Sequence, residues 1–421
     1  MSLFTKQISI KSLIIYGIDG QKEAVLGDNI TTVLNIHYFE NIFQPNFAFE
    51  IKFVSVDNPL SDLQLRGTET VSIEMKHPSI QESFEFDDLV LTSFVQNSAE
   101  STANIFTIRA EPVGVINNEK NRVTQRYDHK VVGTVHVKNI LQSQIGASED
   151  DIDIEYSVNQ VGFFGNYWRP YKALYWIAKR SMSGSMPEDG GSTDRVGFLF
   201  WMTKTGYKFK SIDTIISDGK KNGVLQYFQN DVISDNPNFD LYNCKFEYDQ
   251  NIVKQMNSSM YGEKRKYFNL HSLFDTKEVA FSKSNSKQAH LGDEEMVNLD
   301  FDLNENPSRT TRVPIVDFTM RMDGTINSGD GEYNPHKVIS QSRMRYETLL
   351  CKSLRATVPM NIELEAGRVI NVKLIKSMGG VDNWMSGYYL IKDLRHAVHF
   401  TENGVQCYTY LRLVRDTPGD D

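Results

Sequence analysis

Residues 386–398 read SGYYLIKDLRHAV, and residues 407–416 read CYTYLRLVRD. Both runs are rich in β-branched and aromatic side chains that alternate with polar ones, which is typical of strands in a sheet. His396 lies three residues after Asp393 and three before His399, so in a strand its side chain points to the face opposite to those of both residues. The three side chains are therefore badly placed to share a metal ion. We predict that both runs are strands of a β-sheet and that His396 is an ordinary strand residue without a chemical role.

An earlier part of the chain repeats this order of strands. The runs VSIEMKH (71–77), FEFDDLVLTSFVQN (84–97) and NIFTIRAEP (104–112) form one series, and INVKLIK (370–376) followed by the two runs above forms another. A polar loop precedes the last strand each time. The pattern predicts a duplicated antiparallel β-barrel, with chance similarity between β-patterns as the alternative, because few residues are identical.

The middle of the chain has a different character. WRPYKALYWIAKRSM (168–182) carries Pro170 at a first helical position and has one apolar face, and a hairpin follows it. By contrast, VVGTVHVKNIL (131–141) alternates as a strand does. The run 338–359 predicts a helix with Leu350 and Leu354 on one side.

These patterns predict a mainly β fold with α+β insertions, containing two related, tube-like antiparallel β-barrels and smaller domains. The predicted division is a first barrel at 1–145, an α+β module at 146–215, a second barrel at 216–255 and 338–421, and an inserted subdomain at 256–337.

Composition excludes several classes of protein. The 421 residues are 40% hydrophobic and 24% charged, as in a soluble globular protein of several domains. A net charge of −9 argues against broad wrapping of duplex nucleic acid. Three widely spaced cysteines (Cys244, Cys351 and Cys407) fit a reducing compartment. No run approaches the roughly 20 apolar residues of a membrane span, so we expect neither a leader nor membrane insertion.

The sequence carries no catalytic signature of the GxSxG, HExxH, Walker A or GxGxxG kind. The loop DGTINSGDGEYN (323–334) resembles a calcium loop only superficially, because Ser328 stands at the required glycine and Asn334 at the final glutamate. We therefore expect no enzymatic activity, no catalytic residues, no metal and no cofactor. A carboxylate pair of the glycosidase kind stays open, since acidic residues are plentiful.

Two short stretches are candidate interfaces. One is the aromatic stretch with Tyr167, Trp168 and Arg169, because such residues anchor protein interfaces. Packing of a helix onto the following hairpin is the alternative for this stretch. The other is the basic run with Lys264, Arg265 and Lys266, for which a solvated loop or a salt-bridged rim is the alternative.

The order of barrel, helix with hairpin, insertion, helix and closing strands resembles the central hub protein of contractile-tailed phage baseplates. It is also similar to the hub part of VgrG-type spikes. The residues that carry the resemblance are YKALYWIAKRSMS, GFLFWMTKTGYKFKSIDTI, SGYYLIKDLRHAV and YTYLRLVRD. They include Phe198, Phe200, Gly206, Phe209 and Ser211, and Gly387, Tyr389, Ile391, Leu394 and His396.

The resemblance implies a homotrimer whose two barrels per chain form a pseudo-sixfold ring between the tail tube and a trimeric cell-puncturing spike. The implied partners are the spike, a tail-tube or tube-initiator protein, baseplate wedge proteins and the tape-measure protein in the lumen, with DNA only in transit. The implied location is the virion tail baseplate, after assembly of this late protein in the host cytoplasm. A trimeric receptor-binding or glycan-cleaving tail protein is the alternative.

Overall fold

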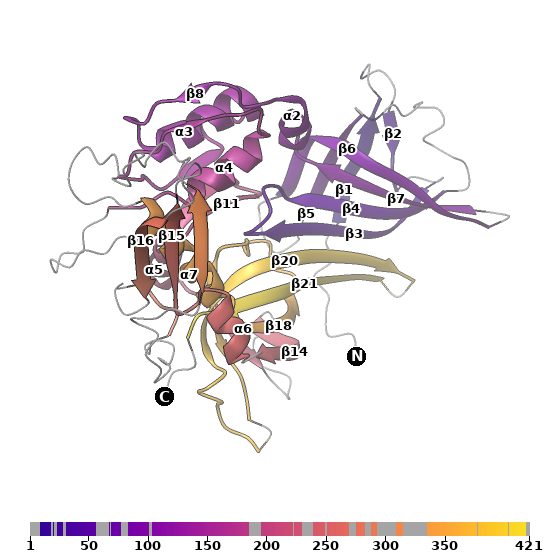
Figure 1. The fold of residues 1–421 in the computed structure, drawn as a ribbon. Coiled ribbons are helices and arrows are strands. Elements are labelled where there is room, and N and C mark those ends of the chain that lie inside the picture. The colour runs from indigo at the N-terminus through magenta and orange to yellow at the C-terminus, as the bar shows by residue number, and fades with distance from the viewer. Residues whose placement is uncertain are drawn as a thin grey trace.

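The computed structural model describes residues 9–17, 20, 23–27, 31–55, 67, 69–76, 83–100, 103–184, 195–221, 223–229, 239–248, 251–268, 275–282, 288–292, 309–314, 335–376, 378–402 and 404–417. Within them, strands outweigh helices, as the sequence predicts (Figure 1). The calcium-like loop at 323–334 lies outside the described residues.

One large sheet runs through both halves of the chain in the order β19-β13-β14-β18-β21-β20-β3-β4-β7-β6-β5-β1-β2. Its N-terminal strands are β1 (Ser9–Tyr16), β2 (Glu23–Val25), β3 (Thr31–Asn41), β4 (Ala48–Ser55), β5 (Thr70–Lys76), β6 (Ser83–Glu100) and β7 (Ala103–Glu111). Its C-terminal strands are β13 (Gln226–Gln229), β14 (Asp240–Tyr248), β18 (Lys352–Pro359), β19 (Val369–Lys373), β20 (Gly387–Thr401) and β21 (Gly404–Arg415).

The six C-terminal strands close into a barrel, because β19 pairs with β20 as well as with β13. The same five-strand order occurs in both halves: β3-β4-β7-β6-β5 in the first and β14-β18-β21-β20-β19 in the second. The predicted fold class, mainly β with two related units, is confirmed. We call β1–β7 the first unit and the closed barrel the second unit.

The two units share one hydrophobic core. Alternate residues of each strand turn inward, and the buried side chains of both units belong to a single cluster that includes Phe49, Phe53, Phe106, Leu354 and Leu413. Each of these side chains is fully buried. Burial of such side chains stabilises a fold by about 1.5–3 kcal/mol each, so this common core favours keeping the units together.

A helical module covers one end of the first unit (Figure 1). It contains α2 (Gly114–Lys120), β8 (Arg126–Tyr127), α3 (Gly133–Ile140), the π-helix η1 (Leu141–Ile145), β9 (Ile152–Ile154), β10 (Phe163–Phe164), α4 (Pro170–Ala178), β11 (Phe198–Thr203) and β12 (Gly206–Ser211). Pro170 opens α4 as predicted, and β11 and β12 form the predicted hairpin.

The strand prediction for 131–141 was wrong, since Gly133–Ile140 is the helix α3. Val137, Ile140 and Leu141 are buried against α4 at helical spacing, and a run this short also fits an alternating pattern. Residues 123–145 share their core with α4 and the hairpin rather than with the first unit.

The remaining elements lie beside the second unit. They are α5 (Ile212–Lys221), α6 (Ile252–Asn257), β15 (Gly262–Phe268), β16 (Asp275–Ser282), β17 (Thr310–Pro314) and α7 (Pro335–Leu349), with β15 central in a three-stranded sheet. The predicted helix at 338–359 was wrong in its second half. The helix ends at Leu349, and Leu354 lies in β18, where alternate residues face the barrel core.

Candidate functional site

The two units meet where β20 of the second pairs with β3 of the first. The pairs run from Asp393 opposite Asn41 to His399 opposite Asn35, in antiparallel register. We call this ladder the seam. It continues the hydrogen bonding of one unit into the other, so neither unit has a free strand edge at this point.

Three buried polar groups occupy the core side of the seam. The Tyr38 hydroxyl donates to the Glu40 carboxylate at 2.5 Å. The same carboxylate accepts from the backbone N–H of Lys204, in the β11–β12 turn, at 3.0 Å and from that of Ala366 at 2.7 Å. Glu40 therefore ties the first unit to the helical module and to the second unit. Burial raises the pKa of Glu40 to about 7, although these hydrogen bonds oppose the shift.

His396 lies on the same side, and its ring stacks on that of Tyr38 with 5.8 Å between centroids. Its Nδ1 is 2.8 Å from the Thr409 hydroxyl of β21. The side chain is 2% exposed, and burial, together with the charge of Lys204, lowers its pKa to about 3. His396 is therefore neutral near pH 7 and packs in the wall.

An extra residue in β20, between Ile391 and Asp393, sets the faces of this strand. Ile391, Leu394 and Val398 join the core, whereas Asp393 and Arg395 face the other side. The predicted assignment of Asp393 and His396 to opposite faces is therefore correct. In a regular strand Ile391 and Asp393, two residues apart, would face the same side of the sheet. The bulge turns them to opposite sides.

The outer side of the seam is a shallow groove of about 570 Å³ between the two units. Its lining includes Phe39, Asp393, Arg395, Tyr410 and Arg412. The Arg395 guanidinium lies over the Tyr410 ring, 4.1 Å from its centroid. The groove is open, and its charges are of both signs.

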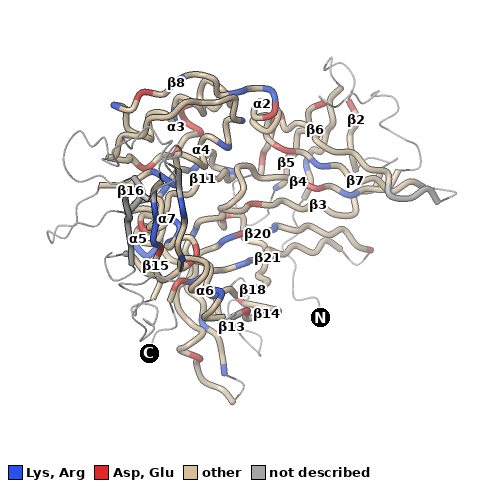
Figure 2. The backbone as a smooth tube through the Cα atoms, in the orientation of Figure 1, with Lys and Arg blue, Asp and Glu red and all other residues tan. Residues whose placement is uncertain are grey.

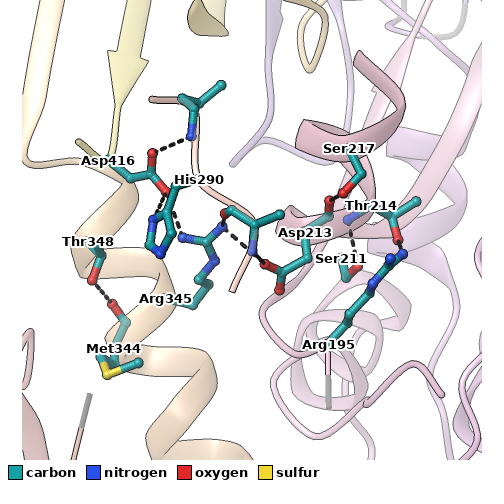
Figure 3. A network of polar contacts seen from close by, with 12 residues as sticks. Arg195, Ser211, Asp213, Thr214, Ser217, His290, Met344, Arg345, Thr348 and Asp416 are labelled. Carbon is teal, nitrogen blue, oxygen red and sulfur yellow. Dashed lines mark hydrogen bonds and ion pairs between the residues drawn. The ribbon is translucent and has the colours of Figure 1, made fainter. Parts of the chain in front are cut away.

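A second polar centre joins the insertion to the second unit (Figure 3). The Arg345 guanidinium of α7 is fully buried, 3.2 Å from the Asp213 carboxylate of α5 and 2.8 Å from the Asp416 carboxylate after β21. His290 Nδ1 lies 3.0 Å from Asp416 Oδ2, the same oxygen that accepts from Arg345. We call Asp213, His290, Arg345 and Asp416 the clamp.

The clamp holds a short strap, residues 288–292, by its backbone. Ala289 N–H donates to Asp213 at 2.8 Å, Leu291 N–H donates to Asp416 at 2.9 Å, and Arg345 donates to the Ala289 carbonyl. The Leu291 side chain is fully buried beside Leu349. Side chains of the clamp thus make the hydrogen bonds to the strap's backbone that a neighbouring strand would make in a sheet.

The two carboxyls of the clamp respond differently to their burial. For Asp416 burial would raise the pKa, but the His290 hydrogen bond and the Arg345 charge bring it well below its usual range. For Asp213 burial outweighs the Arg345 charge, and its pKa is raised. Both still compensate the guanidinium that lies between them.

The predicted interface residues lie in two separate places. Tyr167 is 74% exposed in a turn where its φ is +56°, while Trp168 packs on Phe163 and Trp176, and Arg169 is 2.8 Å from the Glu119 carboxylate. This stretch combines helix packing with one exposed ring.

The basic run 264–266 lies in β15, the central strand of its sheet, rather than in a loop. Lys264 and Lys266 are half-buried, whereas Arg265 is turned inward, 3.2 Å from the Glu263 carboxylate. The interface role of all six residues stays a prediction.

Basic and acidic residues are interspersed over both units rather than gathered by sign (Figure 2). In the described residues no group of three or more metal-binding side chains comes together. No described helix has both the length and the apolar character of a membrane span. Sequence reasoning missed Glu40 and Arg345, because the other segments that each of them joins are far away in the chain and leave no local pattern.

Comparisons with known proteins place the fold. No protein-family model and no curated protein matches the sequence. The structure is similar to that of the tail protein from Neisseria meningitidis MC58, with a TM-score of 0.57 and 10% identity over 98% of both chains. It is also similar to the 43 kDa tail protein of prophage MuSo2 from Shewanella oneidensis, with a TM-score of 0.52 and 9% identity over 96% of this chain and 98% of that one. The chain therefore shares a whole-chain fold with these tail proteins.

Proposed function

We propose that this chain is a structural protein of a phage tail baseplate, a homotrimeric central hub whose ring joins the tail tube to a trimeric spike. The observation that carries the proposal is the five-strand order that occurs twice along one continuous sheet. Three such chains supply six similar units while keeping threefold symmetry, which is what an adaptor between a sixfold tube and a threefold spike requires.

Two further observations support this proposal. The fold is shared, over nearly the whole of each chain, with two phage-type tail proteins. The seam is a ladder of backbone hydrogen bonds between units, and such a ladder resists the separation of its strands when force is transmitted along the wall. The proposed mechanism is therefore mechanical.

We expect no catalytic activity. Strongly perturbed pKa values mark active sites only when the groups face a cleft. Glu40, His396 and Asp416 are each at most 2% exposed and hydrogen-bonded to neighbouring segments, although Glu40 also contributes to the lining of the shallow groove. Nothing in this arrangement favours the glycan-cleaving alternative.

The partners and limits follow from this proposal. The insertion at 256–337 is proposed to face the spike, and the ring to contact tube and wedge proteins, with the tape-measure end and then DNA passing through its lumen. We infer that the helical module begins near residue 114 instead of 146, because α2, α3 and η1 pack with it. The other predicted domain limits stay predictions, and the proposed location is the virion.

Negative-stain electron microscopy of the purified chain, with its mass in solution, tests the proposal. End-on views with six lobes around a hole, at the mass of three chains, are expected. Co-expression with the neighbouring tail proteins is the second arm, which covers a hub that closes only around its spike. A monomer in both arms would contradict the hub.

A further inference from the structure

The two units also share a bulge and the residues that follow it, up to a second bulge of β6 between Gln96 and Ser98 that β20 lacks. β20 carries one extra residue beside β21 between Ile391 and Asp393, and β6 carries one beside β7 between Leu91 and Ser93. Beyond these bulges Arg395 pairs with Tyr410 in the second unit, and Val95 pairs with Thr107 in the first. Val95 is thus the counterpart of Arg395, and Gln96 that of His396.

The same reasoning gives the counterparts of β3. In the first unit Tyr38 pairs with Phe49, which pairs in turn with Ala110 of β7. In the second unit Phe246 pairs with Leu354, which pairs in turn with Leu413 of β21. Ala110 and Leu413 are equivalent, because each pairs with the residue just before the shared bulge. Phe246 is therefore the counterpart of Tyr38. One residue on, Glu247 is the counterpart of Phe39.

Inside the chain these positions form the seam, with Arg395 opposite Phe39 and His396 opposite Tyr38. The counterpart of this seam would be made by β6 and β14. These two strands lie towards opposite ends of the continuous sheet, too far along the strand order to pair within one chain.

Each of the two strands has a stretch of edge with which no described strand pairs. β5 covers β6 only as far as Val90, and among the described strands β7 alone pairs with the part beyond it. Val95 there is 47% exposed. Beside β14, β13 reaches only Asp240 and Leu241, and no described strand covers Glu247 on the side away from β18.

A long strand with one uncovered edge is a template for pairing with another chain. β6 has 18 residues, and its outer half extends with β7 away from the rest of the first unit (Figure 1). Glu247 needs no charged partner from the next copy, because its carboxylate lies 3.1 Å from Arg355 and 3.9 Å from Arg412 of its own chain.

We propose that β6 of one copy pairs antiparallel with β14 of the next copy, with Val95 opposite Glu247 and Gln96 opposite Phe246. The contact repeats between copies the seam that joins the units within each copy. It is head-to-tail, so it closes into a ring when the rotation between copies allows. Only the number of copies in the ring, three, rests on the proposed hub function.

Cysteine pairs test the register in a full-length chain whose three native cysteines are replaced by serine or alanine. Val95→Cys with Glu247→Cys is the test pair, since facing residues have Cβ atoms about 4.5–5.5 Å apart, near the reach of a disulfide. Phe39→Cys with Arg395→Cys is the matched control, because it occupies the counterpart place within one chain. Val95→Cys with Lys245→Cys is the off-register control.

The expected result is that mild oxidation converts most of the test pair into covalent oligomers on a non-reducing gel, and that the off-register pair reacts more slowly. The Phe39–Arg395 pair should close within single chains. Ring particles without test-pair oligomers would overturn the β6–β14 contact and leave the hub standing. Cross-linked open filaments would support the contact and contradict the hub, and monomers without cross-links would overturn the contact.

A charge variant gives a readout that does not depend on oxidation. In an Arg355→Met background, where Glu247 has lost its nearer cation, Val95→Glu places a like charge opposite Glu247 and should raise the concentration for half-assembly by roughly fivefold, whereas Val95→Lys should not weaken assembly. Equal assembly by both variants, at unchanged monomer stability, would overturn the proposed register.

Discussion

The seam and the clamp both join segments that are distant in the sequence, but they do so with opposite chemistry. At the seam, backbone groups of β3 and β20 satisfy one another, and burial shifts the pKa values of Tyr38, Glu40 and His396 so as to favour their neutral forms. At the clamp, the strap has no ladder, so charged side chains satisfy its backbone. Where backbone groups pair with one another, as in the seam, the side chains are free to pack. Where a segment has no such partner strand, as in the strap, buried charged side chains have to bind its backbone groups.

The largest effect should come from breaking the clamp. Arg345→Met removes the cation between Asp213 and Asp416 and leaves both carboxylates buried without it, which should cost about 3–5 kcal/mol. The urea dependence of unfolding measures this loss. Arg355→Met is the matched control, because Arg355 is half-exposed in a surface ion pair with Glu247, and it should cost about 0–1 kcal/mol. Equal losses would refute the contrast between buried and surface charge.

The pH response separates the seam from the clamp. The folded pKa of Glu40 is about 7, against 4.5 for the unfolded chain, so the unfolded state loses its proton first as pH rises. Relative to Glu40→Gln, the wild type should lose stability between pH 4.5 and 7 by about 1.4 kcal/mol per pH unit.

Asp416 has the opposite sign. Its folded pKa is depressed, so its contribution is present above the unfolded value of 3.8 and is lost as pH falls below it. Thermal unfolding of wild type, Glu40→Gln and Asp416→Asn from pH 3 to 8 checks both slopes. A pH-independent difference between wild type and Glu40→Gln would show that Glu40 is not buried in this way.

A smaller effect is expected from His396→Ala. The change removes a buried ring and its hydrogen bond to Thr409, which should cost about 2 kcal/mol, while the β3–β20 ladder keeps its backbone pairs. Assembly, seen by electron microscopy, should stay intact. His399→Ala is the control on the outer face of the same strand and should cost less, because His399 is only partly buried. Loss of assembly in a folded His396→Ala variant would give His396 a role that this structure does not.

Local patterns were sufficient where one interaction dominated. Alternation in 386–398 and 407–416 predicted β20 and β21, and Pro170 with an apolar face predicted α4. The same rule failed at 131–141, where a short run fits two periods and packing against α4 selected the helix. The repeated strand order, proposed from the patterns, is present in the sheet.

By itself, the sequence determined the class of fold, the order of strands in each unit and the absence of a catalytic motif, because these depend on residues close together in the chain. Only the tertiary structure decided that β3 continues β20, that Glu40 binds three segments and that Arg345 gathers Asp213, His290 and Asp416. Such contacts join residues up to 364 positions apart, since His399 of β20 pairs with Asn35 of β3, and neither strand carries a local pattern that marks the other as its partner. Which strand edges remain uncovered after each unit has formed its sheet decides such pairing, and that is a property of the assembled fold.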